Sequence, residues 1–341
     1  LASIEIPNSV TSIGKYAFQN ASSLTTVTFE AGPTLAIIGD SAFRSSGLAS
    51  IEIPKSVTSI GNYTFDNITS LTSVTFEADS SLNLIGNYAF QYSGLTSIII
   101  PKSVTSIGVN IFRLATSLTT VTFEADSSLN YIGVYAFNKS GLTSIEIPNS
   151  VTSIGFGAFE NTTSLTTVTF EANSSLISIG GFAFQLSGLT SIEIPNSVTS
   201  IGEFAFLNAT ALTTVTFEVD STLASIGDGA FNSSGLASIE IPNSVTSIGK
   251  YAFSETSSLT SVAFETGSTL TTIGAWTFLQ SGLTSIEIPN SVTSIGIYAF
   301  RETSDLSSVT FEANSSLITI GDNAFYQSAL TSIIIPNSVT T

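Results

Sequence analysis

The sequence contains no cysteine, no histidine and no methionine among its 341 residues, and only eight of them are lysine or arginine. Without cysteine there is neither a disulfide nor a thiolate metal site, and without histidine the chain lacks the commonest metal ligand and the usual general base. Because 25 residues are acidic, the net charge is -17. This charge disfavours nucleic acid and anionic lipid as partners. No apolar run approaches the roughly 20 residues that cross a bilayer, so we expect no direct membrane insertion.

What the chain has instead is a repeat with a constant period. An Ile-Pro pair recurs every 47 residues without insertion or deletion, with its proline at Pro7, Pro54, Pro101, Pro148, Pro195, Pro242, Pro289 and Pro336. Each 47-residue repeat divides into half-units of 23 and 24 residues that begin at a leucine, Leu1 and Leu24 in the first repeat. We therefore predict a single stacked solenoid over residues 1–341, with about 14.5 half-units.

Every half-unit opens with alternating polar and apolar residues, which predicts a short strand with one buried side. In "LASIEIP", Ile4 and Ile6 share one face while Ser3 and Glu5 share the other. The full array predicts about fifteen such strands. A phenylalanine later in each half-unit, from Phe18 to Phe325, predicts a continuous buried aromatic row.

The repeat resembles the BspA-like, or Treponema-type, branch of the leucine-rich-repeat family. The opening of leucine-rich repeats is present as Leu1, Ile4 and Ile6, and the continuation "IPNSVTSIGKYAF" is similar to the BspA-like pattern across the whole chain. The cysteine that this family often places three residues after the phenylalanine is replaced, for example by Ser46 and Ser140. The resemblance implies a right-handed leucine-rich-repeat superhelix with a parallel β-sheet on the concave face and short irregular or helical turns on the convex face. It also implies a cell-surface protein used for adhesion.

The outward positions of the predicted strands form a candidate binding surface on the concave face. They alternate between glutamate and threonine, and a further glutamate follows the second strand of each unit, while no basic residue lies on a predicted strand. We expect the concave face to be strongly negative. The candidate residues are Glu5, Thr28, Glu30, Glu52, Thr75, Glu77, Ile99, Thr122, Glu124, Glu146, Thr169, Glu171, Glu193, Thr216, Glu218, Glu240, Glu265, Glu287, Thr310 and Glu312.

Several interpretations of this surface remain open. The charges can simply keep an open sheet soluble, or they can bind a basic partner. Convergence of Glu5 and Glu30 on Ca²⁺ is a weaker alternative, because no loop supplies the six to eight oxygens that this ion takes. Rows of threonine also suggest ice binding, which the intervening glutamates oppose. We expect no enzyme activity and no cofactor, because no carboxylate pair has singular surroundings of the kind that catalysis needs.

The positions that vary most lie after the glycine of each half-unit and often hold an aromatic residue. Such rings can cover the core, or they can form a convex contact surface; the candidates for such a contact are Tyr16, Tyr63, Phe156, Phe204 and Trp276. Four asparagines in Asn-x-Ser/Thr sequons share one phase of the repeat and are candidate glycosylation sites: Asn20, Asn67, Asn161 and Asn208.

The array starts in register and stops after a predicted strand, with no polar capping repeat visible. We expect either flanking residues beyond this chain or end-to-end stacking, because an uncapped solenoid exposes its core. The favoured function is a non-enzymatic extracellular or cell-surface scaffold for adhesion or interaction with a protein or matrix partner. The alternative is a structural subunit of an extracellular filament or coat, formed by self-association.

Overall fold

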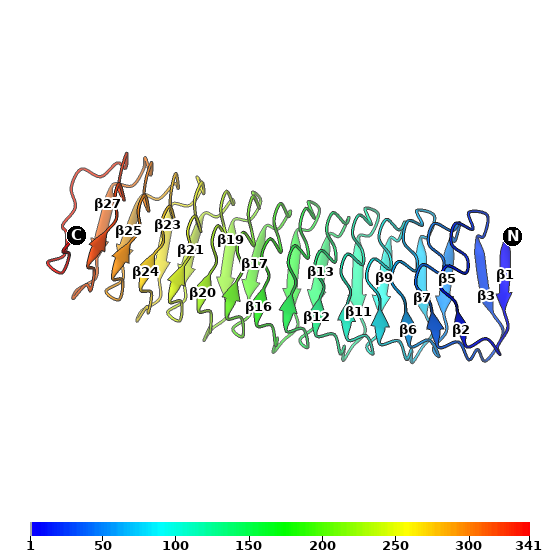
Figure 1. The fold of residues 1–341 in the computed structure, drawn as a ribbon. Coiled ribbons are helices and arrows are strands. Elements are labelled where there is room, and N and C mark those ends of the chain that lie inside the picture. The colour runs from blue at the N-terminus through cyan, green and yellow to red at the C-terminus, as the bar shows by residue number, and fades with distance from the viewer. Residues whose placement is uncertain (1) are drawn as a thin grey trace. The chain divides into compact units, whose positions relative to one another are not determined.

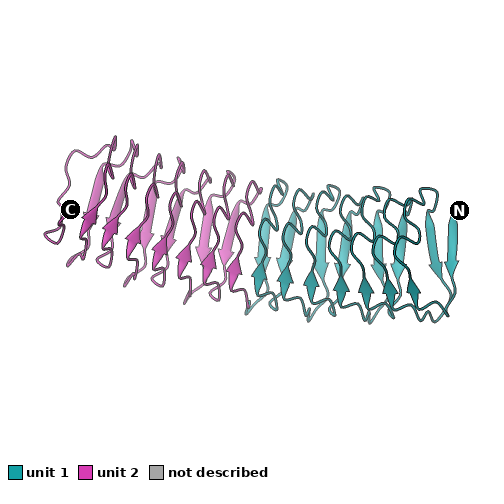
Figure 2. Ribbon diagram, viewed as in Figure 1, with its two compact units in different colours: residues 1–174 teal, residues 175–341 magenta. Residues whose placement is uncertain are grey.

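The computed structural model describes residues 2–341, so Leu1 lies outside the described part of the chain. Its residues fall into two compact units, 1–174 and 175–341, coloured separately in Figure 2. Each unit is a parallel β-solenoid (Figure 1). Every half-unit before residue 330 contributes one four-residue strand and one two-residue strand. The prediction of one solenoid over the whole chain stays a prediction.

In the first unit, the four-residue strands follow the predicted alternation. Their bounds are β1 Ser3–Ile6, β3 Thr26–Phe29, β5 Ser50–Ile53, β7 Ser73–Phe76, β9 Ser97–Ile100, β11 Thr120–Phe123, β13 Ser144–Ile147 and β15 Thr167–Phe170. The two-residue strands are β2 Ser12–Ile13, β4 Ile37–Ile38, β6 Ser59–Ile60, β8 Leu84–Ile85, β10 Ser106–Ile107, β12 Tyr131–Ile132 and β14 Ser153–Ile154.

The second unit repeats this arrangement. Its four-residue strands are β17 Ser191–Ile194, β19 Thr214–Phe217, β21 Ser238–Ile241, β23 Ser261–Phe264, β25 Ser285–Ile288 and β27 Ser308–Phe311. Its two-residue strands are β16 Ser178–Ile179, β18 Ser200–Ile201, β20 Ser225–Ile226, β22 Ser247–Ile248, β24 Thr272–Ile273, β26 Ser294–Ile295 and β28 Thr319–Ile320.

The four-residue strands do not pair evenly. Inside a 47-residue repeat all four residues pair, as in β1 with β3, where Glu5 lies opposite Thr28. Between consecutive repeats at most the first residue pairs, as in β3 with β5 and β11 with β13, and β7 and β9 belong to separate sheets. The second unit shows the same difference between β17–β19 and β19–β21. The sheet therefore opens at the junctions between repeats, which the uniform sequence spacing did not predict.

The predicted core is confirmed within each unit. Rings from Phe18 to Phe159 stack at centroid distances of 5.1 to 5.6 Å. In the second unit, rings from Phe184 to Phe325 stack at 5.1 to 5.5 Å. Stacked rings of this kind add to the free energy gained by burying their area.

The return segment between the two-residue strand and the next half-unit contains the main departure from expectation. No helix is present in residues 2–341, so the helical turns expected on the convex face are replaced by consecutive turns. Two residues of this return segment have positive φ, such as Tyr16 at 62° and Asn20 at 59° in the first half-unit. Their backbone N–H groups donate to the next half-unit, Tyr16 to Asp40 O and Asn20 to Arg44 O. These bonds between coils compensate the cost of the left-handed conformation.

The recurrence of glycine after isoleucine in successive half-units has a steric cause. A Cβ placed on Gly86 would lie 2.6 Å from the backbone nitrogen of Asn62 in the preceding coil. The coils thus approach each other at this point too closely for any side chain. The hand of the superhelix stays a prediction.

The fifteenth predicted strand is not formed. Residues 332–335 have no strand, and Ile335 is 41 % exposed, whereas the equivalent Ile288 is fully buried. This stretch adjoins β27 across a junction between repeats, where at most one residue pairs elsewhere, whereas β1, which also ends the array, pairs over four residues with β3. The described chain has fourteen four-residue strands.

Candidate interaction surfaces

The outward side of the four-residue strands, which we name the strand face, carries two exposed rows. The first is a row of hydroxyl side chains that begins with Ser3 and Thr26. The second alternates between glutamate and threonine, as in Glu5 and Thr28, with the exceptions of Ile99, which is 60 % exposed, and Ala263. Both rows lie where the sequence predicts them, because the alternation of each strand fixes which side chains leave the core.

The glutamates of the second row take no part in holding the fold together. In residues 2–341 no side-chain hydrogen bond or ion pair involves any of Glu5, Glu52, Glu146, Glu193, Glu240 and Glu287. The threonines of the same row likewise donate no side-chain hydrogen bond; they are Thr28, Thr75, Thr122, Thr169, Thr216 and Thr310. These groups are available to a partner.

The glutamates that follow the second strand of each repeat have a structural role that sequence reasoning missed. Each carboxylate accepts a hydrogen bond from the backbone N–H of the residue after the proline in the same 47-residue repeat, at 2.9 to 3.0 Å. The pairs are Glu30 with Asn8, Glu77 with Lys55, Glu124 with Lys102, Glu171 with Asn149, Glu218 with Asn196, Glu265 with Asn243 and Glu312 with Asn290. The constant offset of 22 residues between glutamate and donor is the signal that could have found them.

Clefts lie on the strand face where consecutive repeats separate. One, of about 310 Å³, lies between β11 and β13 and is lined by Thr122, Glu146 and Glu171 among others. A second, of about 260 Å³, lies between β3 and β5 and includes Thr28, Glu52 and Glu77. Each cleft thus combines a threonine of one repeat with two glutamates of the next. Within residues 2–341, however, no group of three or more acidic side chains could hold a metal ion.

The opposite side of the coils, which we name the turn face, contains the predicted aromatic candidates. Tyr16 is 59 % exposed. Tyr63 stacks on Tyr88 at 4.5 Å, and Trp276 is sandwiched between Tyr251 and Tyr298 at 5.0 and 5.7 Å. Trp276 is therefore engaged on both ring faces and offers only its edge to a partner.

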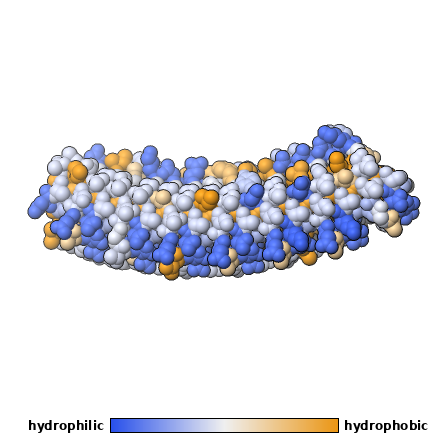
Figure 3. Space-filling model, turned by 90° about the horizontal axis from the view of Figure 1, so that it is seen from below, coloured by the Kyte–Doolittle hydropathy of each residue, from blue (hydrophilic) through white to orange (hydrophobic). Residues whose placement is uncertain are grey.

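The remaining two aromatic candidates also contact neighbouring rings. Phe204 packs against Phe182 at 5.1 Å with the rings tilted by 31°. Phe156 meets the ring of Tyr135 edge-on at 5.6 Å. Figure 3 shows, on the face that it views, hydrophobic groups exposed in small separate clusters between hydrophilic ones. The aromatic side chains of the turn face thus contact one another in short groups within each unit. That these rings cover the core stays a prediction.

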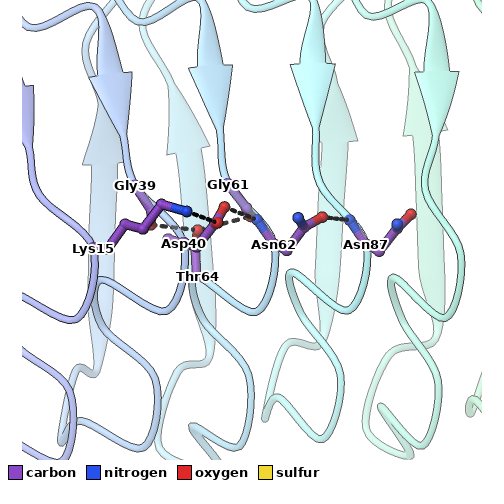
Figure 4. A network of polar contacts seen from close by, with 7 residues as sticks. All are labelled: Lys15, Gly39, Asp40, Gly61, Asn62, Thr64 and Asn87. Carbon is purple, nitrogen blue, oxygen red and sulfur yellow. Dashed lines mark hydrogen bonds and ion pairs between the residues drawn. The ribbon is translucent and has the colours of Figure 1, made fainter.

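A chain of polar contacts links successive turns next to this face, as Figure 4 shows. The side chain of Asp40 accepts from the backbone N–H of Asn62 at 3.0 Å, and that of Asn62 accepts from the N–H of Asn87 at 2.8 Å. Lys15 also pairs with Asp40 at 2.8 Å. The Lys15 ammonium and the Asn62 N–H together hold the pKa of Asp40 below its usual range. These positions therefore stabilise the stacking of coils.

Arg44 holds a second ion pair on the turn face, in less exposed surroundings. Its Nε lies 2.9 Å from Asp66 Oδ2, and its guanidinium lies over the ring of Tyr63. Burial raises the pKa of Asp66 even though Arg44 opposes this shift. Asp40 and Asp66 thus differ in the sign of their pKa shifts, although both face a cation.

The four candidate glycosylation sites differ in exposure. Asn20 and Asn67 are exposed, whereas Asn161 and Asn208 are half-buried. The amide of Asn67 donates to Ser45 Oγ, and that of Asn161 donates to Glu160. Glycosylation at any of them stays a prediction. Residues 2–341 also contain no helix long and apolar enough to cross a membrane.

Comparison with known proteins agrees with the repeat and its geometry. Residues 1–119, 83–213, 130–236 and 224–341 match the family model described as the BspA type leucine rich repeat region, with six copies. A leucine-rich repeat protein from Bacteroides ovatus is similar in structure, with 26 % identity, a TM-score of 0.66, and coverage of 86 % of this chain and 80 % of its own. The pneumococcal vaccine antigen PcpA has 23 % identity and a TM-score of 0.50, with coverage of 94 % and 79 %. No curated protein matches the sequence significantly.

Proposed function

Because the chain belongs to the BspA-type leucine-rich repeat family, we propose that it is a non-enzymatic interaction scaffold at the cell surface or outside the cell. The observation that carries this proposal is the division of the acidic residues on the strand face. One glutamate row is used by the fold, whereas the other is exposed and unpaired in the described residues. A side chain that contributes nothing to the fold and recurs at the same point of successive repeats is suited to contact a partner.

The partner that fits this surface is a basic, extended protein or matrix segment. Free glutamates recur every second strand, so neighbouring ones are separated by roughly 10 Å along the array. A chain that crosses the strands can therefore place successive cations opposite successive carboxylates. The hydroxyl row beside them supplies donors and acceptors for the backbone of such a segment.

The experiment measures binding of a lysine-rich peptide to a triple variant of the second unit, Glu193→Gln with Glu240→Gln and Glu287→Gln. We expect binding to weaken about tenfold, because three exposed charge contacts together contribute on the order of 1–2 kcal/mol. The matched control removes three exposed charges outside the strands, by Glu203→Gln, Asp305→Asn and Asp322→Asn. Equal weakening by both triple variants would show that only net charge matters and would refute the strand face as the site.

Surface location is the second part of the proposal and is supported by membership of the family. Cleavage of the protein by a protease added to intact cells of its source is the expected result, and complete protection would contradict it. The alternative of a filament or coat subunit stays a prediction.

A further inference from the structure

The turn face has an aromatic row, and one of its interruptions leaves an open pocket. The row is formed by the second residue after the glycine of each half-unit, and Tyr88 and Tyr135 are members of it. Its non-aromatic positions are Ser41, Asn110, Gly157, Gly229 and Asn323. Asn110 stands between them, in the position where Trp276 stands between Tyr251 and Tyr298. The ring of Tyr135 lies over Gly157, on the side away from Asn110. A Cβ on Gly157 would lie within 2.4 Å of this ring. The place of one ring is thus left unfilled.

The pocket at this interruption has a volume of about 390 Å³. Tyr88 and Tyr135 form part of its wall together with Arg113, Lys139 and Glu160. This volume lies within the range of small-molecule sites, which hold roughly 300–1,000 Å³. No other half-unit combines a missing ring with two cations at the neighbouring turn positions, so the pocket is singular in an otherwise repetitive chain.

Asn110 provides an independent indication of a ligand. Its side chain lines the pocket, is only 8 % exposed, and makes no hydrogen bond within residues 2–341. The backbone N–H of Asn110 is satisfied by Val134 O, so only the side-chain amide lacks a partner. The polar atoms of this amide are not fully enclosed, so they are open to the pocket that Asn110 lines. A ligand in the pocket can therefore accept from and donate to this amide.

The charged groups around the pocket are held in place but are not neutralised by one another. Asn138 is 4 % exposed and links two of them, since Arg113 Nε donates to its Oδ1 at 3.4 Å and its Nδ2 donates to Glu160 at 3.1 Å. In the described residues neither Arg113 nor Lys139 has an ion-pair partner within 4.0 Å. The two cations and the one carboxylate leave a local positive charge on a strongly acidic protein.

We propose that this pocket binds an acidic pyranose, a sugar ring that carries a carboxylate. The outer N–H groups of Arg113 match a carboxylate in the planar, two-bond geometry that guanidinium favours, and Lys139 adds a second charge. The phenol rings of Tyr88 and Tyr135 offer flat surfaces to the sugar ring. Asn110 and the remaining lone pairs of Glu160 meet its hydroxyl groups. This site is on the opposite side from the strand face, so it does not depend on the function proposed there.

The test titrates the full chain with glucuronate by calorimetry or saturation-transfer NMR, with glucose and inorganic phosphate as comparison probes. Glucuronate is expected to bind saturably and at least about tenfold more tightly than glucose, which lacks the anion, or phosphate, which lacks the ring. Absence of saturable glucuronate binding, or equal binding of phosphate, would overturn the proposal.

Two variants locate the site. Asn110→Tyr restores the residue found at the equivalent positions 63, 88 and 135 and fills the gap, and Arg113→Gln introduces the residue found at positions 19, 91 and 185. Both changes are compatible with the fold, and each is expected to weaken glucuronate binding about tenfold or more. Lys250→Gln is the matched control, because it removes an exposed cation that does not line the pocket. Unchanged affinity in the two pocket variants contradicts the assignment.

Discussion

At the scale of single residues, the same amino acid performs two different tasks on the strand face. Glu124 accepts the backbone N–H of Lys102 at 2.9 Å, whereas Glu146 has no hydrogen-bond partner in the described chain. Glu124 directly follows β11, whereas Glu146 is an outward-facing residue within β13. Composition therefore cannot separate them, but the distance to a backbone donor can.

This difference predicts losses of different size for two alanine substitutions. Glu124→Ala is expected to reduce the free energy of unfolding by about 1–2 kcal/mol, because it removes a hydrogen bond to a charged acceptor. Glu146→Ala is expected to change it by less than about 0.5 kcal/mol, as is usual for an exposed side chain without partners. Chemical denaturation of both variants provides the measurement. Equal losses would mean that the bond from Lys102 contributes nothing to stability.

At the scale of elements, the turns are held together by side chains that act on the next coil. Asp40 and Asp66 illustrate this in neighbouring turns, yet their pKa values are shifted in opposite directions. For Asp40 the pKa is lowered, so its ionised form stabilises the folded state above the unfolded pKa, and this contribution is lost as the pH falls. For Asp66 the pKa is raised, so its ionisation in the unfolded state opposes folding as the pH rises through the ordinary aspartate range.

Thermal unfolding at about pH 3.5 and about pH 6 compares the parent with Asp40→Asn and Asp66→Asn, on either side of the ordinary aspartate pKa of about 3.9. From the lower to the higher pH, the parent is expected to gain in melting temperature relative to Asp40→Asn. Over the same pH interval, the melting temperature of the parent is expected to fall relative to that of Asp66→Asn. A change of the same sign against both variants would show that burial does not dominate at Asp66.

The elements also show which features the sequence could predict. Strand positions, the side chains facing out and the phenylalanine row followed from local alternation and a fixed period, because each coil repeats the same environment. The conformation of the turn segment could not be predicted in this way, since Tyr16 and Trp276 have a left-handed backbone conformation that aromatic residues do not favour. It is stabilised by bonds from the next coil, which no single repeat encodes. The buried slot where the family often has cysteine holds serines such as Ser46 and Ser140, whose hydroxyls have no partner in the structure.

The candidate sites follow the same rule. The exposed glutamate row was predictable because it depends only on alternation along a strand. The opening between repeats was not, because it depends on pairing that weakens after the first residue at each junction, as between Thr120 and Ser144. The pocket at Asn110 was not predicted either, because the row lacks an aromatic residue at several positions and only here do the neighbouring turns also supply two cations.

At the scale of the molecule, the uneven pairing makes the 47-residue repeat the structural unit. Four residue pairs join the two four-residue strands of a repeat and at most one joins those of consecutive repeats, as β9–β11 and β11–β13 show, whereas the two-residue strands pair alike at both interfaces. In repeat proteins, stability is approximately a sum of terms within units and between neighbours.

Deleting residues 95–141 removes one whole repeat and rebuilds a junction of the existing kind. Deleting residues 95–117 instead brings two strands of the same type together and removes a four-pair interface without replacing it. We therefore expect the first deletion to keep the melting temperature within a few degrees of the parent's. The second deletion is expected to lower the melting temperature by roughly twice that difference or more, because a loss of about 1 kcal/mol in the free energy of unfolding shifts the melting temperature of a domain by 2–4 °C. Circular dichroism during heating measures both, and equal destabilisation by the two deletions would show that the half-unit, not the 47-residue repeat, is the unit of folding.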